Sequence, residues 1–303
     1  MKALVIGYGS IGSRHVDILK QLECDVAIVS RRPFTDMECF SSISTALRKY
    51  MPEYVVLARE TSSHQADLIE LANNDYAGLV LIEKPIFHKL LQIPENKFKN
   101  AFVAYNLRFH PLILKLHDLL EQEKVLSACV YVGQYLPGWR PGRDYRLTSS
   151  AIDQLGGGVL RDLSHELDYL LWFFGNWRRV TAIGGHYSHL QTTCDDIYTL
   201  LFSADKCPAI SVQMNYLDRV GSRIIIINSD TKTFKLDLVN CILKVNDKSE
   251  TCKIERNDTY ISQHKAILNN NSEHLCTLNH GIEVMSLIEA AENAAQSKEW
   301  ISR

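Results

Sequence analysis

A short apolar segment at the start of the chain runs directly into a glycine-rich loop. Residues 2–6 read Lys-Ala-Leu-Val-Ile, and the loop that follows reads Gly-Tyr-Gly-Ser-Ile-Gly. A GxGxxG loop that follows a buried-type strand and opens a helix is typical of dinucleotide binding, because its glycines allow a tight turn and close approach to a pyrophosphate. A helix over residues 11–20 then directs unpaired N–H groups at the phosphates. The alternative is an ordinary strand–turn–helix unit. The candidate cofactor-binding residues of the loop are Gly7, Tyr8, Gly9, Ser10, Ile11 and Gly12.

The composition limits the class of protein. The chain has 303 residues, of which 46% are hydrophobic and 22% are charged, and a formal net charge of −2. This length favours two domains, and the small net charge argues against a nucleic-acid or membrane-surface protein. The apolar start is too short for a signal peptide, and no later apolar run could span a bilayer, so we expect a cytoplasmic protein. The eight cysteines form no CxxC pair and have no zinc-ligand spacing with histidines, which predicts reduced thiols and no metal.

The first hundred residues alternate strand-like and helix-like segments. Short β-branched runs separated by helical patterns predict an α/β fold with a parallel, doubly wound sheet. The first of these runs is residues 2–6. The others lie at residues 25–29, 54–58, 79–82 and 101–104. We therefore expect a dinucleotide-binding Rossmann domain over residues 1–106.

The second part of the chain, residues 107–303, has a different character. Helical patterns at 111–123, 158–174 and 281–297 flank a series of strand-like runs with little helix between them, which suits a mostly antiparallel sheet. The expected strands lie at 128–134, 180–187, 196–202, 209–216, 223–228 and 233–238. We expect this part to form the substrate and oligomerisation domain.

The second expected strand ends in Ser30-Arg31-Arg32. An NAD-specific site usually places a carboxylate about 20 residues after the glycines, where it binds the ribose 2′-hydroxyl. This chain has a hydroxyl and two guanidinium groups there, and arginine forks match a phosphate bidentately. We therefore favour NADP, bound through its 2′-phosphate, over NAD. The alternative is a solvated basic loop.

Glu83-Lys84-Pro85 directly follows another expected strand. Proline fixes its own φ angle and restricts Lys84 to an extended geometry. A lysine at the carboxyl end of a parallel strand lies in the crevice where α/β proteins bind ligands, and partial desolvation there suits it to proton transfer. The alternative is a lysine that is simply exposed at the end of a strand.

The segment after Gly156-Gly157-Gly158 predicts one helix over residues 158–174. Its apolar stripe, at helical spacing, consists of Leu163, Leu167, Leu170, Leu171 and Phe174. Asp162, His165 and Asp168, each three residues apart, share the opposite side. We expect the leucines to face the core and His165 to be presented between two carboxylates, while the glycines allow close approach of a ligand or of another backbone segment. The alternative is a solvated polar face.

Residues 134–146 form an expected loop with two Pro-Gly steps that leads toward this helix. Trp139 and Tyr145 could stack on a sugar ring, and Arg140 and Arg143 could bind a carboxylate or phosphate. The alternative is a surface loop with solvated arginines.

Taken in order, these segments resemble the Gfo/Idh/MocA family, which includes glucose–fructose oxidoreductase and inositol dehydrogenases. The similarity covers nearly the whole chain. Its motifs are the N-terminal glycine loop, Thr61-Ser62-Ser63-His64, Glu83-Lys84-Pro85, Tyr105-Asn106-Leu107-Arg108-Phe109-His110-Pro111, the triple-glycine helix and the last helix from Gly281 to Trp300. The loop at 134–146 is similar to those of members from bacterial surface-polysaccharide pathways.

The resemblance implies a Rossmann domain followed by an α/β domain with a large open antiparallel sheet. It implies hydride transfer between a nicotinamide cofactor and a secondary alcohol or ketone of a sugar-type substrate. By position, Lys84 matches the active-site lysine and His165 the acid/base histidine, whereas Asp162 is three residues from the histidine where many members have four. The remaining expected contacts are His64 and Glu83 for the cofactor and Arg108 for the substrate.

The resemblance also leaves other activities open. Some relatives cleave glycosides by transient oxidation with tightly held NAD, and a non-catalytic nucleotide-binding protein is a third alternative. Family members usually pair into dimers or tetramers, so we expect a homo-oligomer. The chain departs from the family at Ala58-Arg59-Glu60, where Ala-Thr-Pro is common.

Overall fold

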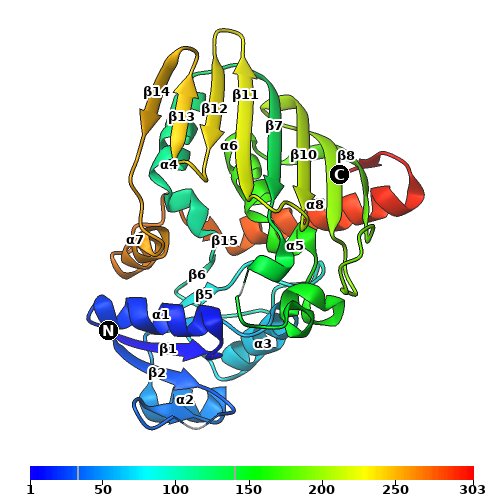
Figure 1. The fold of residues 1–303 in the computed structure, drawn as a ribbon. Helices are drawn as coiled ribbons and strands as arrows, with labels where there is room; N and C mark the ends of the chain where they lie inside the picture. Colours follow the sequence, from blue (N-terminus) through cyan, green and yellow to red (C-terminus); the bar gives the residue numbers. More distant parts are fainter. Residues whose placement is uncertain (33, 140) are drawn as a thin grey trace. The chain divides into compact units, whose positions relative to one another are not determined.

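The computed structural model describes residues 1–32, 34–139 and 141–303. The chain divides into two compact units (Figure 1). The first contains Met1–Phe109 and Arg256–Ile282, and the second contains His110–Glu255 and Glu283–Arg303. Residues 256–282 thus belong to the first unit. The single boundary that we predicted from the sequence, after residue 106, assigns them to the second domain.

The first unit is built on a seven-stranded sheet with the order β15-β6-β5-β4-β1-β2-β3. Its strands are β1 (Lys2–Ile6), β2 (Asp25–Val29), β3 (Cys39–Phe40), β4 (Tyr54–Leu57), β5 (Leu79–Ile82), β6 (Asn100–Val103) and β15 (Cys276–Thr277). All pairs are parallel except β15 with β6. The prediction of a parallel, doubly wound sheet is confirmed.

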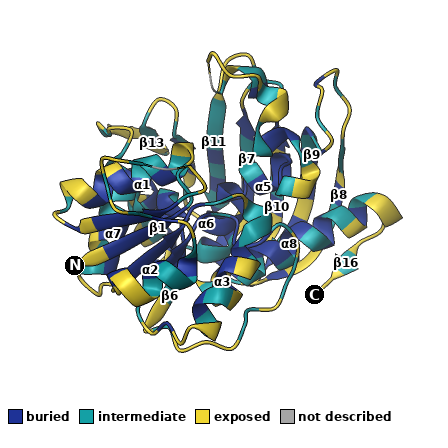
Figure 2. Cartoon of the chain, turned by 90° about the horizontal axis from the view of Figure 1, so that it is seen from below, coloured by how far each residue is buried: buried dark blue, intermediate teal, exposed yellow. Residues whose placement is uncertain are grey.

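Apolar strands and helices build the core of this unit. Every residue of β4 and β5 is buried, and β1 is drawn in the dark blue of buried residues in Figure 2. Strands that are buried on both faces need helices on both sides of the sheet, which explains their continuous apolar sequence. The helices are α1 (Ser10–Gln21), α2 (Ile43–Tyr50), α3 (His64–Asn73) and α7 (Asp258–Leu268), with short 3-10 turns at Thr61–Ser63 and Asn106–Phe109.

The second unit contains a nine-stranded sheet with the order β14-β13-β12-β11-β7-β10-β9-β8-β16. Its strands are β7 (Val125–Gly133), β8 (Trp177–Gly185), β9 (Ile197–Ala204), β10 (Cys207–Asn215), β11 (Ser222–Ser229), β12 (Thr233–Asp237), β13 (Ile242–Val245), β14 (Lys248–Thr251) and β16 (Ile301–Ser302). Among the described residues of this second sheet, the only parallel pair is β7 with β10, so the prediction of a mostly antiparallel sheet is confirmed.

Residues along these strands alternate between buried and exposed positions, as an antiparallel sheet with one covered face requires. The α-helices of the second unit are α4 (Pro111–Leu120), α5 (Val159–Asp162) and α6 (His165–Phe174), and α8 (Leu278–Ser297) crosses the boundary between the units. Within the described part of the chain, no helix has both the length and the apolar character that a bilayer span requires.

The prediction of one continuous helix over 158–174 is wrong. The segment forms α5 and α6, and α5 ends at Asp162, because its C-cap Leu163 has a φ of −98° and a ψ of 23°, which are not helical. The Glu166 N–H donates to the Leu163 carbonyl at 3.3 Å, a shorter step than the α-helical one, so the chain turns more tightly here. Leu163 and Leu167 are buried as expected.

The alternative of a solvated polar face does not hold. His165 is 9% exposed and Asp168 only 1%, so the first turns of α6 are buried all round.

Candidate active site

The glycine loop after β1 has the geometry that a pyrophosphate needs. Gly7 has a φ of +100°, which favours glycine, and a Cβ on Gly12 would lie 2.0 Å from the Gly7 carbonyl oxygen. Gly9 differs from both, since a Cβ there would meet no heavy atom of the described residues within 4 Å. The turn and the helix packing therefore require Gly7 and Gly12, while the backbone at Gly9 borders open space.

The loop leads straight into α1, which begins at Ser10 with Gly9 as its N-cap. The N–H groups of a helix's first turn have no acceptor within the helix, and together with the helix dipole they attract anions. Tyr8 is fixed beside the loop by an edge-on contact with Phe34, with ring centroids 4.6 Å apart. The start of α1 can therefore hold a phosphate group.

The register of the sheet brings further candidate residues to the same edge. Ile6 stands opposite both Val29 and Leu57, and Leu57 in turn stands opposite Ile82. The carboxyl ends of β1, β2, β4 and β5 are therefore aligned, which is where open α/β sheets bind ligands. The residues that leave the sheet at this edge are Gly7, Ser30, Ala58 and Glu83.

Basic side chains follow two of these strands. Arg31 and Arg32 are exposed, and the Arg32 N–H donates to the Ser30 hydroxyl at 3.0 Å, which shapes the turn after β2. Arg59 is half-buried, and its Nε donates to a carboxylate oxygen of Asp67 at 2.8 Å. Burial, and then the charge of Arg31, lower the pKa of Arg59.

Arg59 is therefore a further candidate residue. A Cβ on Gly7 would lie 2.7 Å from its Cγ, which places the Arg59 side chain against the glycine loop. The sequence marked Arg59 only as a departure from the family pattern, because nothing local shows which strand end it follows.

Lys84 is half-buried and follows β5 by one residue, at the ligand edge of the sheet. Its backbone N–H donates to Glu83 Oε2 at 3.1 Å. The other carboxylate oxygen, Oε1, lies 2.8 Å from Nε2 of the fully buried His15. The position of Lys84 is thus tied to the conformation of the Glu83 carboxylate.

A chain of buried polar groups continues from His15. Its Nδ1 lies 2.8 Å from Nε2 of His264, and the Nδ1 of His264 lies 2.9 Å from the Tyr54 hydroxyl. Burial lowers the pKa of His264 well below its usual value. A carboxylate can only accept, so with both rings neutral the protons have one order: Tyr54 donates to His264, His264 to His15, and His15 to Glu83.

In this arrangement each of the four side chains has a hydrogen-bond partner, which a buried polar network requires. His264 belongs to α7, in the segment that returns to the first unit, so its place beside His15 could not be predicted from local sequence.

Two other predicted contacts are buried. His64 has no exposed surface, its Nδ1 lies 3.1 Å from the Ile86 carbonyl oxygen, and its Nε2 lies 3.2 Å from the Arg59 carbonyl oxygen. Burial lowers its pKa, and these carbonyls only partly offset that effect. Arg108 is 2% exposed, and its Nη1 donates to the Leu275 carbonyl oxygen. Both side chains hold backbone segments in place.

In the second unit, the predicted site residues Asp162 and Trp139 both contact Tyr216, which the sequence analysis did not single out. The Tyr216 hydroxyl donates to Asp162 Oδ2 at 2.6 Å, and the Tyr216 ring packs edge-on against Trp139 at 5.3 Å. Tyr216 is fully buried, and burial together with Asp162 raises its pKa well above the usual value. Tyr216 therefore orients the Asp162 carboxylate. Sequence reasoning missed it, because a tyrosine at the end of a strand carries no signal of its own.

The start of α6 is anchored by an ion pair. Arg223 Nε lies 2.7 Å from Glu166 Oε1, and the Glu166 side chain is fully buried. Since Glu166 directly follows His165, this pair fixes the turn that carries the histidine.

The glycines before α5 make room for protein rather than for a ligand. A Cβ on Gly158 would lie 2.3 Å from Asp195 Oδ1, and a Cβ on Gly157 would lie 2.3 Å from the Ser149 carbonyl oxygen. Asp195 accepts from the Leu160 N–H at 3.0 Å, which caps α5. Burial raises the pKa of Asp195 to about 6, although the hydrogen bond from Leu160 opposes this.

The loop before α5 holds the remaining predicted contacts. Trp139 and Tyr145 line a cavity of about 10 Å³ together with Leu136, Thr148 and Ser150, which is room for about one water molecule. The Tyr145 hydroxyl accepts from the Gln191 N–H at 3.0 Å. Arg143 is exposed, and Arg140 lies outside the described residues.

Several solved structures are similar to this chain. GenD2 from gentamicin A biosynthesis, in complex with NAD, is 18% identical over 100% of this chain and 96% of its own, with a TM-score of 0.83. The WlbA dehydrogenase from Bordetella pertussis, in complex with NADH and UDP-GlcNAcA, is 19% identical over 100% and 98%, with a TM-score of 0.81. Levoglucosan dehydrogenase, in complex with NADH and L-sorbose, is 15% identical over 100% and 98%, with a TM-score of 0.84. At these identities the similarity shows a shared fold. Neither a family model nor a curated protein matches the sequence.

Proposed function

We propose that this protein is a nicotinamide-dependent oxidoreductase of the Gfo/Idh/MocA type. It transfers a hydride between NAD(P) and a secondary alcohol or ketone of a sugar or sugar derivative. The observation that carries the proposal is the open space beside Gly9, at the same sheet edge as Lys84. The structures of similar fold that hold NAD or NADH, among them dehydrogenases in complex with UDP-GlcNAcA or L-sorbose, support the same reaction class.

The residues of the first unit fit the cofactor. Gly9 and the first turn of α1 hold the pyrophosphate, because the backbone is open to solvent there and its N–H groups are directed outward. Arg31 and Arg32 bind the 2′-phosphate of NADP, since both guanidinium groups are exposed at the end of β2 and no carboxylate replaces them. Arg59, against Gly7, adds positive charge to the pyrophosphate site.

The cofactor, when bound, accepts or supplies the hydride. The chain's own residues supply orientation and proton transfer. Lys84 binds the reacting hydroxyl and shares the transfer of its proton with His165, and Glu83 fixes Lys84 through its backbone N–H. His15 and His264 keep the Glu83 carboxylate in one conformation. His64 positions the segment after Lys84.

In the second unit, we assign the acid/base role to His165, with Asp162 held ready by Tyr216. Trp139, Tyr145 and Arg143 contribute to the sugar site. The ion pair of Glu166 with Arg223 fixes the turn that carries His165, which keeps a catalytic side chain in one orientation.

The test is a screen of the purified full-length protein with NADP+ and NAD+ against sugars, sugar acids and nucleotide sugars. Turnover is monitored by the absorbance of the reduced nicotinamide. We expect turnover with at least one of these classes. A protein that binds neither NADPH nor NADH in a fluorescence titration contradicts the proposal.

A further inference from the structure

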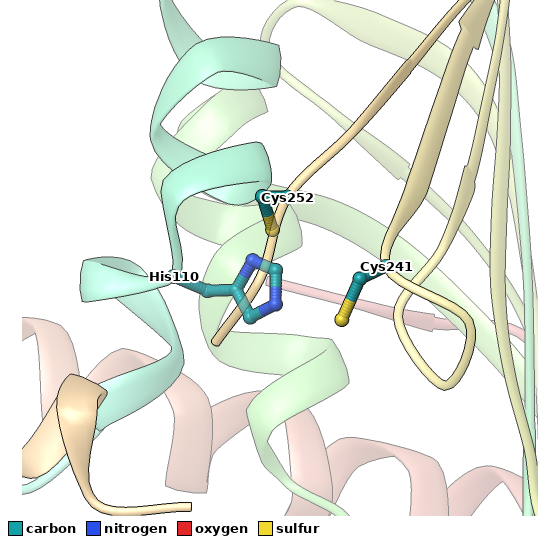
Figure 3. A group of neighbouring side chains, drawn as sticks. All are labelled: His110, Cys241 and Cys252. Carbon is teal, nitrogen blue, oxygen red and sulfur yellow. The ribbon is translucent and has the colours of Figure 1, made fainter. Parts of the chain in front are cut away.

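A histidine and two cysteines from separate segments of the second unit lie close together. His110 is the N-cap of α4, Cys241 lies between β12 and β13, and Cys252 follows β14. One ring nitrogen of His110 and the two sulfur atoms all lie within 4.8 Å of one another. Figure 3 shows both sulfur atoms next to the imidazole ring. Short-range spacing could not indicate this cluster, because its members are brought together by the fold.

The sheet register places the two cysteines opposite each other. The pairing of β13 with β14 begins at Ile242 and Thr251, so Cys241 and Cys252 face each other at the next position. The Cys252 N–H donates to the Cys241 carbonyl oxygen at 3.2 Å, which continues the ladder. Burial and the neighbouring Cys241 thiol raise the pKa of Cys252. The closeness of the thiols is therefore fixed by the backbone.

His110 adds a buried nitrogen whose bonding is incomplete. The residue is 4% exposed, and its Nδ1 accepts from the Leu112 N–H at 3.2 Å as the cap of α4. Its Nε2 is buried and has no hydrogen-bond partner among the described residues. Buried polar atoms are rarely left without a partner unless a ligand or ion supplies one. An imidazole nitrogen is a common metal ligand in proteins.

We propose that His110, Cys241 and Cys252 bind Zn²⁺, with a solvent molecule as the fourth ligand. Two sulfur ligands with one imidazole suit Zn²⁺ better than Mg²⁺ or Ca²⁺, which prefer oxygen. Tetrahedral Zn²⁺ holds such atoms about 3.3–3.8 Å apart, so small side-chain rotations close the site. Arg223 does not add an unbalanced charge, because it pairs with Glu166 at 2.7 Å.

Binding of the cation displaces protons from its ligands. Both thiols release a proton to solvent on binding, and the two thiolates neutralise the charge of the cation. Ligation through Nε2 moves the ring proton to Nδ1, so the Leu112 N–H loses its acceptor. The loss of one capping hydrogen bond is small compared with the affinity of thiolate and imidazole for Zn²⁺.

The site lies where the chain enters and leaves the second unit. His110 is the first residue of the second unit, and Cys252 lies just before Glu255, where the chain leaves that unit. A cation there ties both segments to the end of the β12–β13 connection. The second unit is then more stable with Zn²⁺ than without it.

The test uses the full-length protein, reduced and stripped of metal by a chelator, and titrated with Co²⁺ alone. We expect one Co²⁺ per chain, with a sulfur-to-cobalt charge-transfer band and the strong visible absorption of tetrahedral Co²⁺, both removed by added Zn²⁺. Zn²⁺ should also raise the melting temperature.

Two variants and a control localise the site. His110→Asn keeps an oxygen that can cap α4 but removes the ligand nitrogen, and Cys252→Ser removes a sulfur. Each should weaken Co²⁺ binding at least about tenfold, an effect that even outer-shell partners of a metal can have. Cys129→Ser, at an exposed position of β7, should bind like the wild type. A fully reduced wild-type protein without the charge-transfer band, or a His110→Asn variant with unchanged affinity, overturns the proposal.

Discussion

Replacing Gly12 by alanine should lower the stability of the fold, whereas replacing Gly9 by alanine should lower the affinity for the cofactor. In Gly12→Ala, the new Cβ lies 2.0 Å from the Gly7 carbonyl oxygen, so α1 and the loop must separate by more than about 1 Å to restore an ordinary contact. Overpacking of this kind costs about 1–3 kcal/mol. For a protein of this size that is a fall of about 2–5 °C in melting temperature.

Gly9→Ala should leave the fold intact. Gly9 has a φ of −87° and a ψ of −163°, an extended conformation open to any residue, and its Cβ meets no described atom within 4 Å. We expect a stability change within about 1 kcal/mol, because the slightly poorer cap and the reduced freedom of the unfolded chain oppose each other. The methyl group occupies the space of the pyrophosphate, so the affinity for NADPH and NADH should fall at least about tenfold, or about 1.4 kcal/mol.

The assay combines thermal unfolding with fluorescence titration of both reduced cofactors. Wild-type affinity in Gly9→Ala would refute the assignment of the pyrophosphate site. A wild-type melting temperature in Gly12→Ala would refute the packing argument.

Four further variants test the cofactor site, the capping of α5 and the surroundings of His165. Arg31→Ala combined with Arg32→Ala should erase a preference for NADPH over NADH of about tenfold or more, measured by the same titration, and equal or tighter NADH binding to the wild type contradicts the NADP assignment. The raised pKa of Asp195 means that its contribution to stability is present below about pH 4 and is lost as the pH rises through about 6. Unfolding free energies should therefore decline over this window by about 2 kcal/mol more in the wild type than in Asp195→Asn, and parallel profiles contradict this. Leu167→Ala should lower stability by about 2–5 kcal/mol through the cavity it leaves, whereas His165→Asn should lower kcat about 10²–10⁴-fold on a substrate found by the screen; normal turnover by His165→Asn refutes its role.

Local patterns predicted the parts of the fold that depend on local physics. The parallel sheet follows from β-branched strands such as β4 and β5, which are buried along their whole length. The glycine loop was predictable because Gly7 and Gly12 have backbone and packing requirements that only glycine satisfies. The series of strand-like runs with little helix between them likewise indicated the antiparallel sheet of the second unit.

The helix after Gly158 shows where periodicity fails. The apolar stripe correctly predicted that Leu163, Leu167, Leu170 and Phe174 are buried, but helical spacing also predicted one continuous helix. Asp195, from a distant segment, holds the start of α5 through the Leu160 N–H, and the chain turns again at Leu163. Helical spacing cannot reveal a long-range contact of this kind.

Residues that act through distant partners could not be found at all. His264 reaches His15 only because α7 returns to the first unit, and Tyr216 reaches Asp162 only through the order of the second sheet. The sequence contains these side chains but has no local signal for what they contact. For His64 and Arg108 the motif indicated importance, whereas burial shows that their contacts are with backbone carbonyls.

The most direct test of the central claim is the turnover of Lys84→Ala on a substrate identified by the screen. Lys84 leaves β5 at the edge where the glycine loop lies, so its loss should lower kcat about 10²–10⁴-fold. NADPH affinity should stay within a few-fold, and Lys89→Ala, at an exposed lysine nearby in the sequence, should behave like the wild type. A Lys84→Ala enzyme that keeps near-normal kcat would contradict the account.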